Sequence, residues 1–174
     1  IILDTALPVG SILINDDDAY ATSEDVTLTL TSSDATSGVD QVRFSTDGGS
    51  TWTAWEAFAA AKQITLPSGD GTKEVQYQVR DLAGLIATFS DTIILDTALP
   101  VGSILINDDD VYATSEDVTL TLTASDTLSG VDQMRFSEDG GSTWTSWEAF
   151  AATKQLTISS GDGVREILSE IRDL

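Results

Sequence analysis

The chain of 174 residues contains no cysteine and no histidine. Without cysteine it can form neither a disulfide framework nor a thiolate metal site. Without histidine it lacks the side chain that most often acts as a general base or binds a transition metal. These two absences remove the usual nucleophile–base pairs, so we expect the chain not to be an enzyme.

Basic residues and long apolar runs are also scarce. Lys and Arg number 8 against 29 Asp and Glu, which gives a net charge of −21. Such a chain repels nucleic acid and anionic membranes, and it attracts cations. No apolar run approaches the roughly 20 residues of a membrane-spanning helix, so we expect no membrane insertion. The apolar fraction of 41% argues against disorder despite the charge.

The dominant feature of the sequence is an internal repeat. Residues 93–174 match residues 1–82 at 64 of 82 positions. The offset of 92 residues is longer than a solenoid unit, and it is close to the roughly 100 residues of a small β-sandwich. The sequence therefore predicts two tandem domains, 1–92 and 93–174, and the second copy lacks its last strand in this chain.

Within each copy, apolar and polar residues alternate with a period of two. Val26, Leu28 and Leu30 alternate with threonines, which is typical of a half-buried strand. Further strands are expected at 11–15, 40–46, 62–66, 73–81 and 85–94, with 51–55 pairing back across a turn. Segments rich in Asp, Gly and Ser separate them. The fold is therefore expected to be all-β, with two tandem Ig-like (fibronectin III-like) β-sandwiches of about seven strands each.

Several short pieces of the chain resemble the bacterial Ig-like repeats of large cell-surface and adhesin-type proteins. They are Leu3-Asp4-Thr5 with Pro8, Asp34 with Ser37-Gly38-Val39, Arg43-Phe44-Ser45, the tryptophan pair, Gly69-Asp70-Gly71, and Arg80-Asp81 with Ala83-Gly84. The resemblance implies a structural spacer or stalk module of an extracellular bacterial surface protein. Its implied partners are neighbouring repeats of the same chain, with surface glycans or other copies as further candidates. It implies no catalytic residue.

A second pattern, S-x-D-x-G-x-T-W, occurs in both copies and resembles the Asp-box of sialidases. Its residues are Ser45, Asp47, Gly49, Thr51 and Trp52, and then Ser137, Asp139, Gly141, Thr143 and Trp144. Asp and Ser side chains in such a turn bind backbone amides, and the glycines take backbone angles that other residues avoid. A sialidase would also need several propeller blades and an arginine cluster, and Arg43 and Arg80 show no sign of clustering. We therefore interpret the box as a structural turn.

The tryptophans suggest an alternative function. Trp52 and Trp55 are three residues apart, so on a regular strand they point to opposite faces, one in the core and one partly exposed. An exposed Trp55, with Trp147 in the second copy, could stack on a sugar ring as in a carbohydrate-binding module. The other interpretation is that this ring packs against residues 56–60.

The acidic residues suggest calcium as the one candidate cofactor. Asn15–Asp18 does not match the spacing of an EF-hand loop. The loop topology of an Ig sandwich would, however, gather carboxylates of both copies at the junction. Those residues are Asp16, Asp18, Asp70, Asp96, Asp126 and Asp132, with Asp173 beside them. Ca²⁺ takes six to eight oxygen ligands and could bridge them. The other interpretation is a solvated acidic surface.

Overall fold

The computed structural model describes all 174 residues and divides the chain into two units, Ile1–Thr97 and Ala98–Leu174. Both units consist of β-strands joined by turns, apart from the two short 3₁₀ turns η1 (Asn15–Asp17) and η2 (Asn107–Asp109). No helix in the structure has the length and apolar character that a membrane crossing requires. The structure therefore confirms the predicted all-β class.

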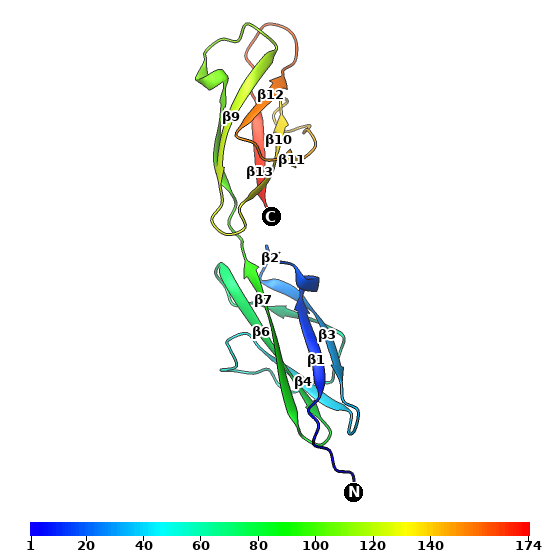
Figure 1. Ribbon diagram of the computed structural model, residues 1–174. Helices are drawn as coiled ribbons and strands as arrows, with labels where there is room; N and C mark the ends of the chain where they lie inside the picture. The colour runs from blue at the N-terminus through cyan, green and yellow to red at the C-terminus, as the bar shows by residue number, and fades with distance from the viewer. The chain divides into compact units, whose positions relative to one another are not determined.

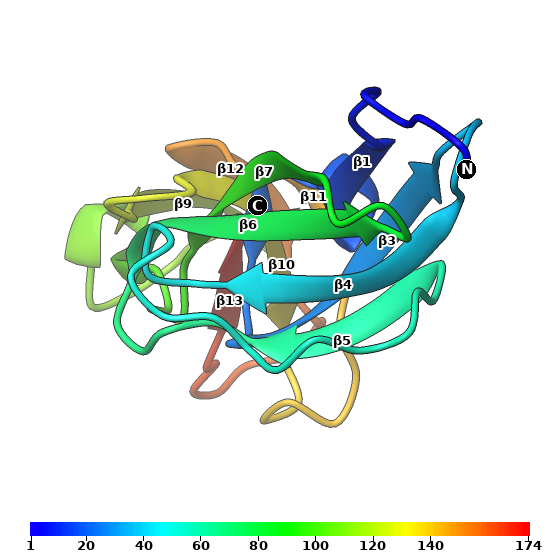
Figure 2. The ribbon, with the colours of Figure 1, turned by 90° about the horizontal axis from the view of Figure 1, so that it is seen from below.

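The first unit is a two-layer sandwich of seven strands. They are β1 (Val9–Ile14), β2 (Tyr20–Ala21), β3 (Asp25–Ser33), β4 (Val39–Ser45), β5 (Ala61–Thr65), β6 (Gly71–Asp81) and β7 (Ile86–Leu95). One sheet has the order β1-β3-β5 and the other β2-β7-β6-β4. Neighbouring strands are antiparallel, except that β2 runs parallel to β7. Figures 1 and 2 show β4, β6 and β7 in one layer, with β1 and β3 in the other.

The core of the first unit lies between these sheets, and the period-two pattern builds it. Val26, Leu28 and Leu30 of β3 are all buried while the threonines between them are exposed. Tyr77 of β6 has no exposed surface and stacks on Phe44 of β4, with ring centroids 5.5 Å apart. Burial raises the pKa of the Tyr77 hydroxyl. The alternation predicted from the sequence therefore decides which face of each strand is buried.

The second unit repeats this plan with six strands. They are β8 (Val101–Ile106), β9 (Asp117–Ser125), β10 (Val131–Ser137), β11 (Glu148–Ala149), β12 (Thr153–Thr157) and β13 (Leu168–Asp173). The sheets have the orders β12-β9-β8 and β11-β10-β13. β13 occupies the sequence position of residues 76–81 of β6, but it pairs only with β10, whereas β6 pairs with both β4 and β7. One edge of β13 is therefore open.

The strand that covers this edge in the first unit also leads into the second copy. β7 continues through Ile93 and Ile94 to Leu95, past the repeat boundary at residue 92. Ile93 and Leu95 are buried in the core of the first unit. The first residues of the second copy therefore complete the sandwich of the first, as the strand pattern at 85–94 predicts.

Candidate functional site

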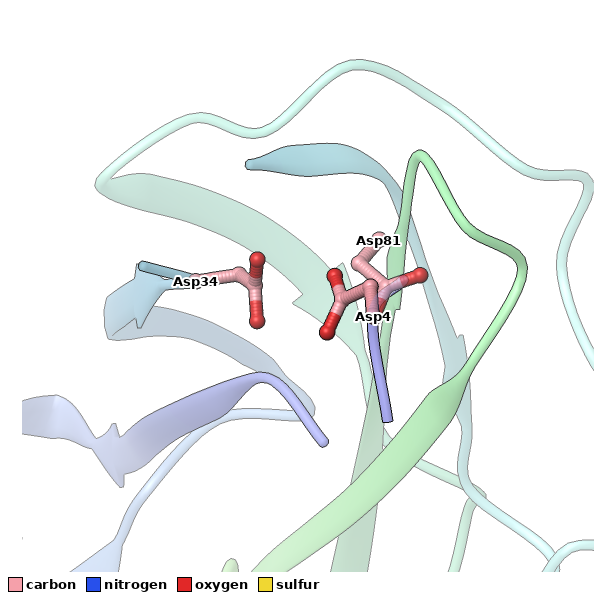
Figure 3. Close-up of side chains that lie close together, drawn as sticks. All are labelled: Asp4, Asp34 and Asp81. Carbon is pink, nitrogen blue, oxygen red and sulfur yellow. The ribbon is translucent and has the colours of Figure 1, made fainter. Parts of the chain in front are cut away.

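Three carboxylates from distant segments meet at one end of the first unit. Asp4 lies in the segment before β1, Asp34 in the loop between β3 and β4, and Asp81 at the end of β6. One carboxylate oxygen from each lies within 4.8 Å of the other two. Figure 3 shows the side chains of Asp4 and Asp34 pointing toward each other, with Asp81 beside Asp4. We name this group the acidic triad.

Asp34 holds its own loop in shape. One of its carboxylate oxygens, Oδ1, accepts hydrogen bonds from the amides of Thr36, Ser37 and Gly38 at 2.8–3.0 Å. Gly38 has a φ of 84°, which glycine adopts without strain. The Gly38 amide, with those of Ser37 and Thr36, lowers the pKa of Asp34 against an opposing effect of burial. Asp34 therefore brings a negative charge to the triad at neutral pH.

Asp81 is the most deeply buried member, with 1% of its surface exposed. Its Oδ1 accepts a hydrogen bond from the amide of Leu85 at 2.8 Å and so closes the turn between β6 and β7. Its Oδ2 is buried and has no hydrogen-bond partner. Burying a carboxylate oxygen without a hydrogen-bond partner costs folding free energy, and a ligand bound to this oxygen would remove that cost.

Asp4 likewise has one hydrogen-bonded carboxylate oxygen and one without a partner. Oδ1 accepts a hydrogen bond from the amide of Ala6 at 3.1 Å, whereas Oδ2 is buried without a partner. Two of the three carboxylates therefore each have one buried oxygen without a hydrogen-bond partner.

No basic side chain neutralises the triad. The ion pairs of the first unit join Lys62 to Glu56 and Arg80 to Asp40, and none includes a member of the triad. At an effective dielectric constant of 20, two unit charges 4.8 Å apart, which is the upper limit of the separations within the triad, repel each other by roughly 3.5 kcal/mol. The arrangement is one that a hard cation would stabilise, because all of its donors are oxygens.

The structure does not bring Asp16, Asp18 and Asp70 into this group. Asp16 and Asp18 are exposed in and after the η1 turn, where Asp16 accepts a hydrogen bond from the Thr29 hydroxyl at 2.7 Å. Asp70 accepts hydrogen bonds from the amide and hydroxyl of Thr97 at 3.0 and 2.8 Å. Asp16 and Asp70 act as acceptors within the first unit because each has a donor close by on a neighbouring segment.

The predicted ligands at the junction belong to different units. Asp96 follows β7 in the first unit, is 4% exposed, and donates its amide to the carbonyl of Ala21. Asp126 lies in the second unit and accepts hydrogen bonds from the amides of Leu128, Ser129 and Gly130. Asp132 is half-buried in β10. Calcium binding by these three residues stays a prediction.

Sequence reasoning missed the acidic triad of the first copy, although a signal was present. Its members are the residues that precede Asp96, Asp126 and Asp173 by one repeat offset. The ligands predicted from the sequence are confined to the junction. Applying the same loop topology to the start of the first copy would have found Asp4, Asp34 and Asp81.

The serine and aspartate of each box pattern close a tight turn after β4 and β10. The Ser45 hydroxyl accepts the Gly49 amide at 2.9 Å and donates to Asp47 Oδ1 at 2.7 Å. Asp47 accepts the amide and hydroxyl of Thr51, and Trp52 Nε1 donates to the Gly49 carbonyl. The second copy repeats every one of these bonds between Ser137 and Trp144. These contacts are all internal to the turn.

The hydrogen bonds of the box turn make the carboxyl group of Asp47 unusually acidic. The Thr51 hydroxyl, then the Thr51 amide and the Ser45 hydroxyl, lower the pKa of Asp47 from 3.8 to about 2. Because the folded pKa is depressed, the stabilisation by this carboxylate is complete above the ordinary value and is lost as the pH falls through about 2. An NMR titration of the Asp47 carboxyl carbon is expected to have its midpoint near that lower value.

Two variants test the cause of this shift. Thr51→Val removes the hydroxyl and is expected to move the midpoint of Asp47 up toward 3.8. Ser50→Ala removes a hydroxyl that binds the Asp47 backbone carbonyl, not the carboxylate, and is expected to leave the midpoint unchanged. A wild-type midpoint at the ordinary value would contradict the hydrogen-bonded turn.

The tryptophans of the first unit lie in a cluster with two arginines. The guanidinium carbon of Arg43 is 4.9 Å from the ring centroid of Trp52 and 4.4 Å from that of Trp55. The guanidinium carbon of Arg80 is 4.6 Å from the Trp55 ring. The second unit repeats the cluster with Arg135, Arg172, Trp144 and Trp147. Such contacts are attractive because a cation faces the electron-rich ring.

Two expectations about this region were wrong. Trp52 and Trp55 do not point to opposite faces, because residues 46–55 form a loop and no strand. Both rings are half-buried and contact Arg43. Arg43 and Arg80 do cluster, because Arg80 pairs with Gln41 across the β4–β6 ladder, two positions from Arg43 on the same face.

The comparisons with known proteins concern the fold. No family model and no curated protein matches the chain. The fibronectin(III)-like modules of Clostridium thermocellum CbhA match with a TM-score of 0.54 and 18% identity, over 93% of this chain and 85% of theirs. Carbohydrate-binding modules of the β-sandwich superfamily match with a TM-score of 0.46 and 14% identity, over 96% of this chain and 85% of theirs. A tetra-tandem repeat from the extending region of a large adhesion protein matches with a TM-score of 0.32 and 15% identity, over 99% of this chain and 50% of that one.

Proposed function

We propose that this chain is a spacer or stalk segment of an extracellular bacterial surface or adhesin-type protein, without catalytic activity of its own. The proposal rests on the tandem repetition of one fibronectin III-like sandwich, with 64 of 82 positions identical between the copies. In a repeat array each copy contacts its neighbours in the chain, and added copies extend the reach of the protein. Near-identical copies therefore suit a function that depends on length.

The repeated polar contacts support the same proposal. Both copies keep the internal hydrogen bonds of the box turn and the tryptophan–arginine cluster. These contacts hold in place the long loop that follows β4 in the first copy and β10 in the second, which contains few strand residues. They give each module a defined surface without using a ligand.

Carbohydrate binding through Trp55 and Trp147 is the alternative proposal. It requires a sugar to stack on an indole ring whose surface two guanidinium groups already contact. The sugar would have to displace an arginine or bind at the ring edge. The spacer proposal needs no such rearrangement.

Small-angle X-ray scattering of the whole chain tests the spacer proposal. The segment from Ser90 to Pro100 has no glycine and only one proline, so we expect a stiff junction and an elongated particle. A compact particle of this length would have a radius of gyration of about 16 Å, and such a value would contradict the proposal.

A binding assay with glycans tests the alternative. Glycan binding by the wild-type chain that is lost in the Trp55→Ala, Trp147→Ala double variant would favour carbohydrate binding.

A further inference from the structure

We propose that the acidic triad of Asp4, Asp34 and Asp81 binds one Ca²⁺ ion. The three carboxylates come from three segments that the fold brings together, and each supplies an oxygen within 4.8 Å of the others. The site lies within the first unit and is distinct from the box turn and from the tryptophan–arginine cluster.

The two unsatisfied oxygens provide the independent argument for a ligand. Only 1% of the surface of Asp81 is exposed, yet its Oδ2 accepts no hydrogen bond. The Oδ2 of Asp4 is buried in the same way. Most buried carboxylate oxygens in folded proteins have a hydrogen-bond donor or a cation as partner. No lysine or arginine pairs with the triad, and a cation from solution would supply the missing partner.

The Oδ1 oxygen of each carboxylate already accepts hydrogen bonds, which fix the orientation of the three side chains. Asp34 Oδ1 is held by three loop amides, Asp81 Oδ1 by the Leu85 amide, and Asp4 Oδ1 by the Ala6 amide. These bonds orient each carboxylate before any ion arrives. Preorganised ligands lose little conformational entropy on binding.

The ligand type and spacing favour calcium. Carboxylate oxygens without any nitrogen or sulfur donor suit a hard cation. Ca–O bonds of about 2.3–2.6 Å allow ligand oxygens up to about 5 Å apart across one ion, which includes the spacing of the triad. Mg²⁺ has shorter bonds, a stricter octahedral geometry and a stronger hold on its water. Water or backbone carbonyl oxygens would complete the six to eight ligands of Ca²⁺.

The site would also order the beginning of the first unit. Asp4 belongs to the segment before β1, whereas Asp34 follows β3 and Asp81 is the last residue of β6. Without a cation, the three like charges favour release of the Asp4 segment. With Ca²⁺ bound, that segment is tied to both sheets of the sandwich.

The test is a calcium titration of the whole chain by isothermal calorimetry, together with thermal unfolding in CaCl₂, in NaCl of equal ionic strength and in chelator. The Asp81→Asn chain is expected to bind one Ca²⁺ fewer than wild type. Asp17→Asn serves as the matched control, because Asp17 is exposed in the η1 turn and outside the triad. This control is expected to bind as many ions as wild type.

The unfolding temperatures give a second readout, because the difference between Asp81→Asn and wild type is expected to depend on whether Ca²⁺ is present. In chelator, Asp81→Asn is expected to match or exceed wild type, because it removes one of three repelling charges and keeps an oxygen for the Leu85 amide. In Ca²⁺ it is expected to unfold at a lower temperature than wild type. Should Asp81→Asn fail to fold, Asp4→Asn replaces it, since Asp4 lies outside every strand. Equal ion counts in wild type and variant, or equal effects of CaCl₂ and NaCl, would overturn the proposal.

Discussion

Replacement of Tyr77 by alanine is expected to lower the unfolding free energy of the first unit by about 3–5 kcal/mol. Tyr77 is fully buried, stacks on Phe44 and lies with its ring centroid 6.1 Å from that of Phe89. Its removal leaves a cavity between the two sheets that the surrounding strands cannot close. Urea unfolding monitored by tryptophan fluorescence and by circular dichroism measures the loss.

The second unit supplies the control for this experiment. Ser169 occupies the sequence position of Tyr77, and it is half-buried. Ser169→Ala removes no ring and is expected to change stability by less than about 0.5 kcal/mol. Equal effects of the two substitutions would contradict the assignment of Tyr77 to the core.

The two units are also expected to unfold separately. The core of the first unit contains 14 buried residues and that of the second contains 6. The second unit should therefore unfold at the lower urea concentration, because it removes less apolar surface from water. Tyr77→Ala is expected to shift only the later transition, and Phe136→Ala only the earlier one.

A strand added to the second unit is expected to stabilise that unit by about 3 kcal/mol. Extending the chain beyond Leu174 with the sequence of residues 83–97 supplies a counterpart of β7 for the open edge of β13. In the first unit, β7 buries Ile93 and Leu95, and burial of each such side chain contributes about 1.5–3 kcal/mol. Ordering the new strand offsets part of this gain.

The core residues of the second unit show what such a strand would cover. Ile104, Ile106 and Ile171 are only partly buried, whereas their counterparts in the first unit, Ile12, Ile14 and Val79, are buried. The measurement is the urea midpoint of the earlier unfolding transition, which should rise. The control extension has serine in place of the residues that match Ile93 and Leu95. An equal rise with both extensions would contradict a β7-like strand on this edge.

Much of the fold follows from local patterns in the sequence. The alternation at Val26, Leu28 and Leu30 predicts both the strand and its buried face, because successive side chains of a strand point to opposite sides. Glycine and aspartate mark the turns because they adopt or stabilise backbone angles that other residues avoid. The repeat then carries each of these inferences to the second copy. Each of these signals lies within a few neighbouring residues, so one sequence is enough to detect them.

Other features depend on contacts between segments that are far apart in the chain. The sequence suggested that carboxylates gather at the loops of the sandwich, but only the packed strands show that Asp4, Asp34 and Asp81 share one small volume. Burial of an oxygen of Asp81 without a partner depends on what surrounds it from every side. The two tryptophans face the same arginine because the loop after the box turn leaves the strand geometry on which the period-two prediction relied. Periodicity predicts the faces of regular strands, whereas the surroundings of a side chain are decided by which strands pair and how their loops pack.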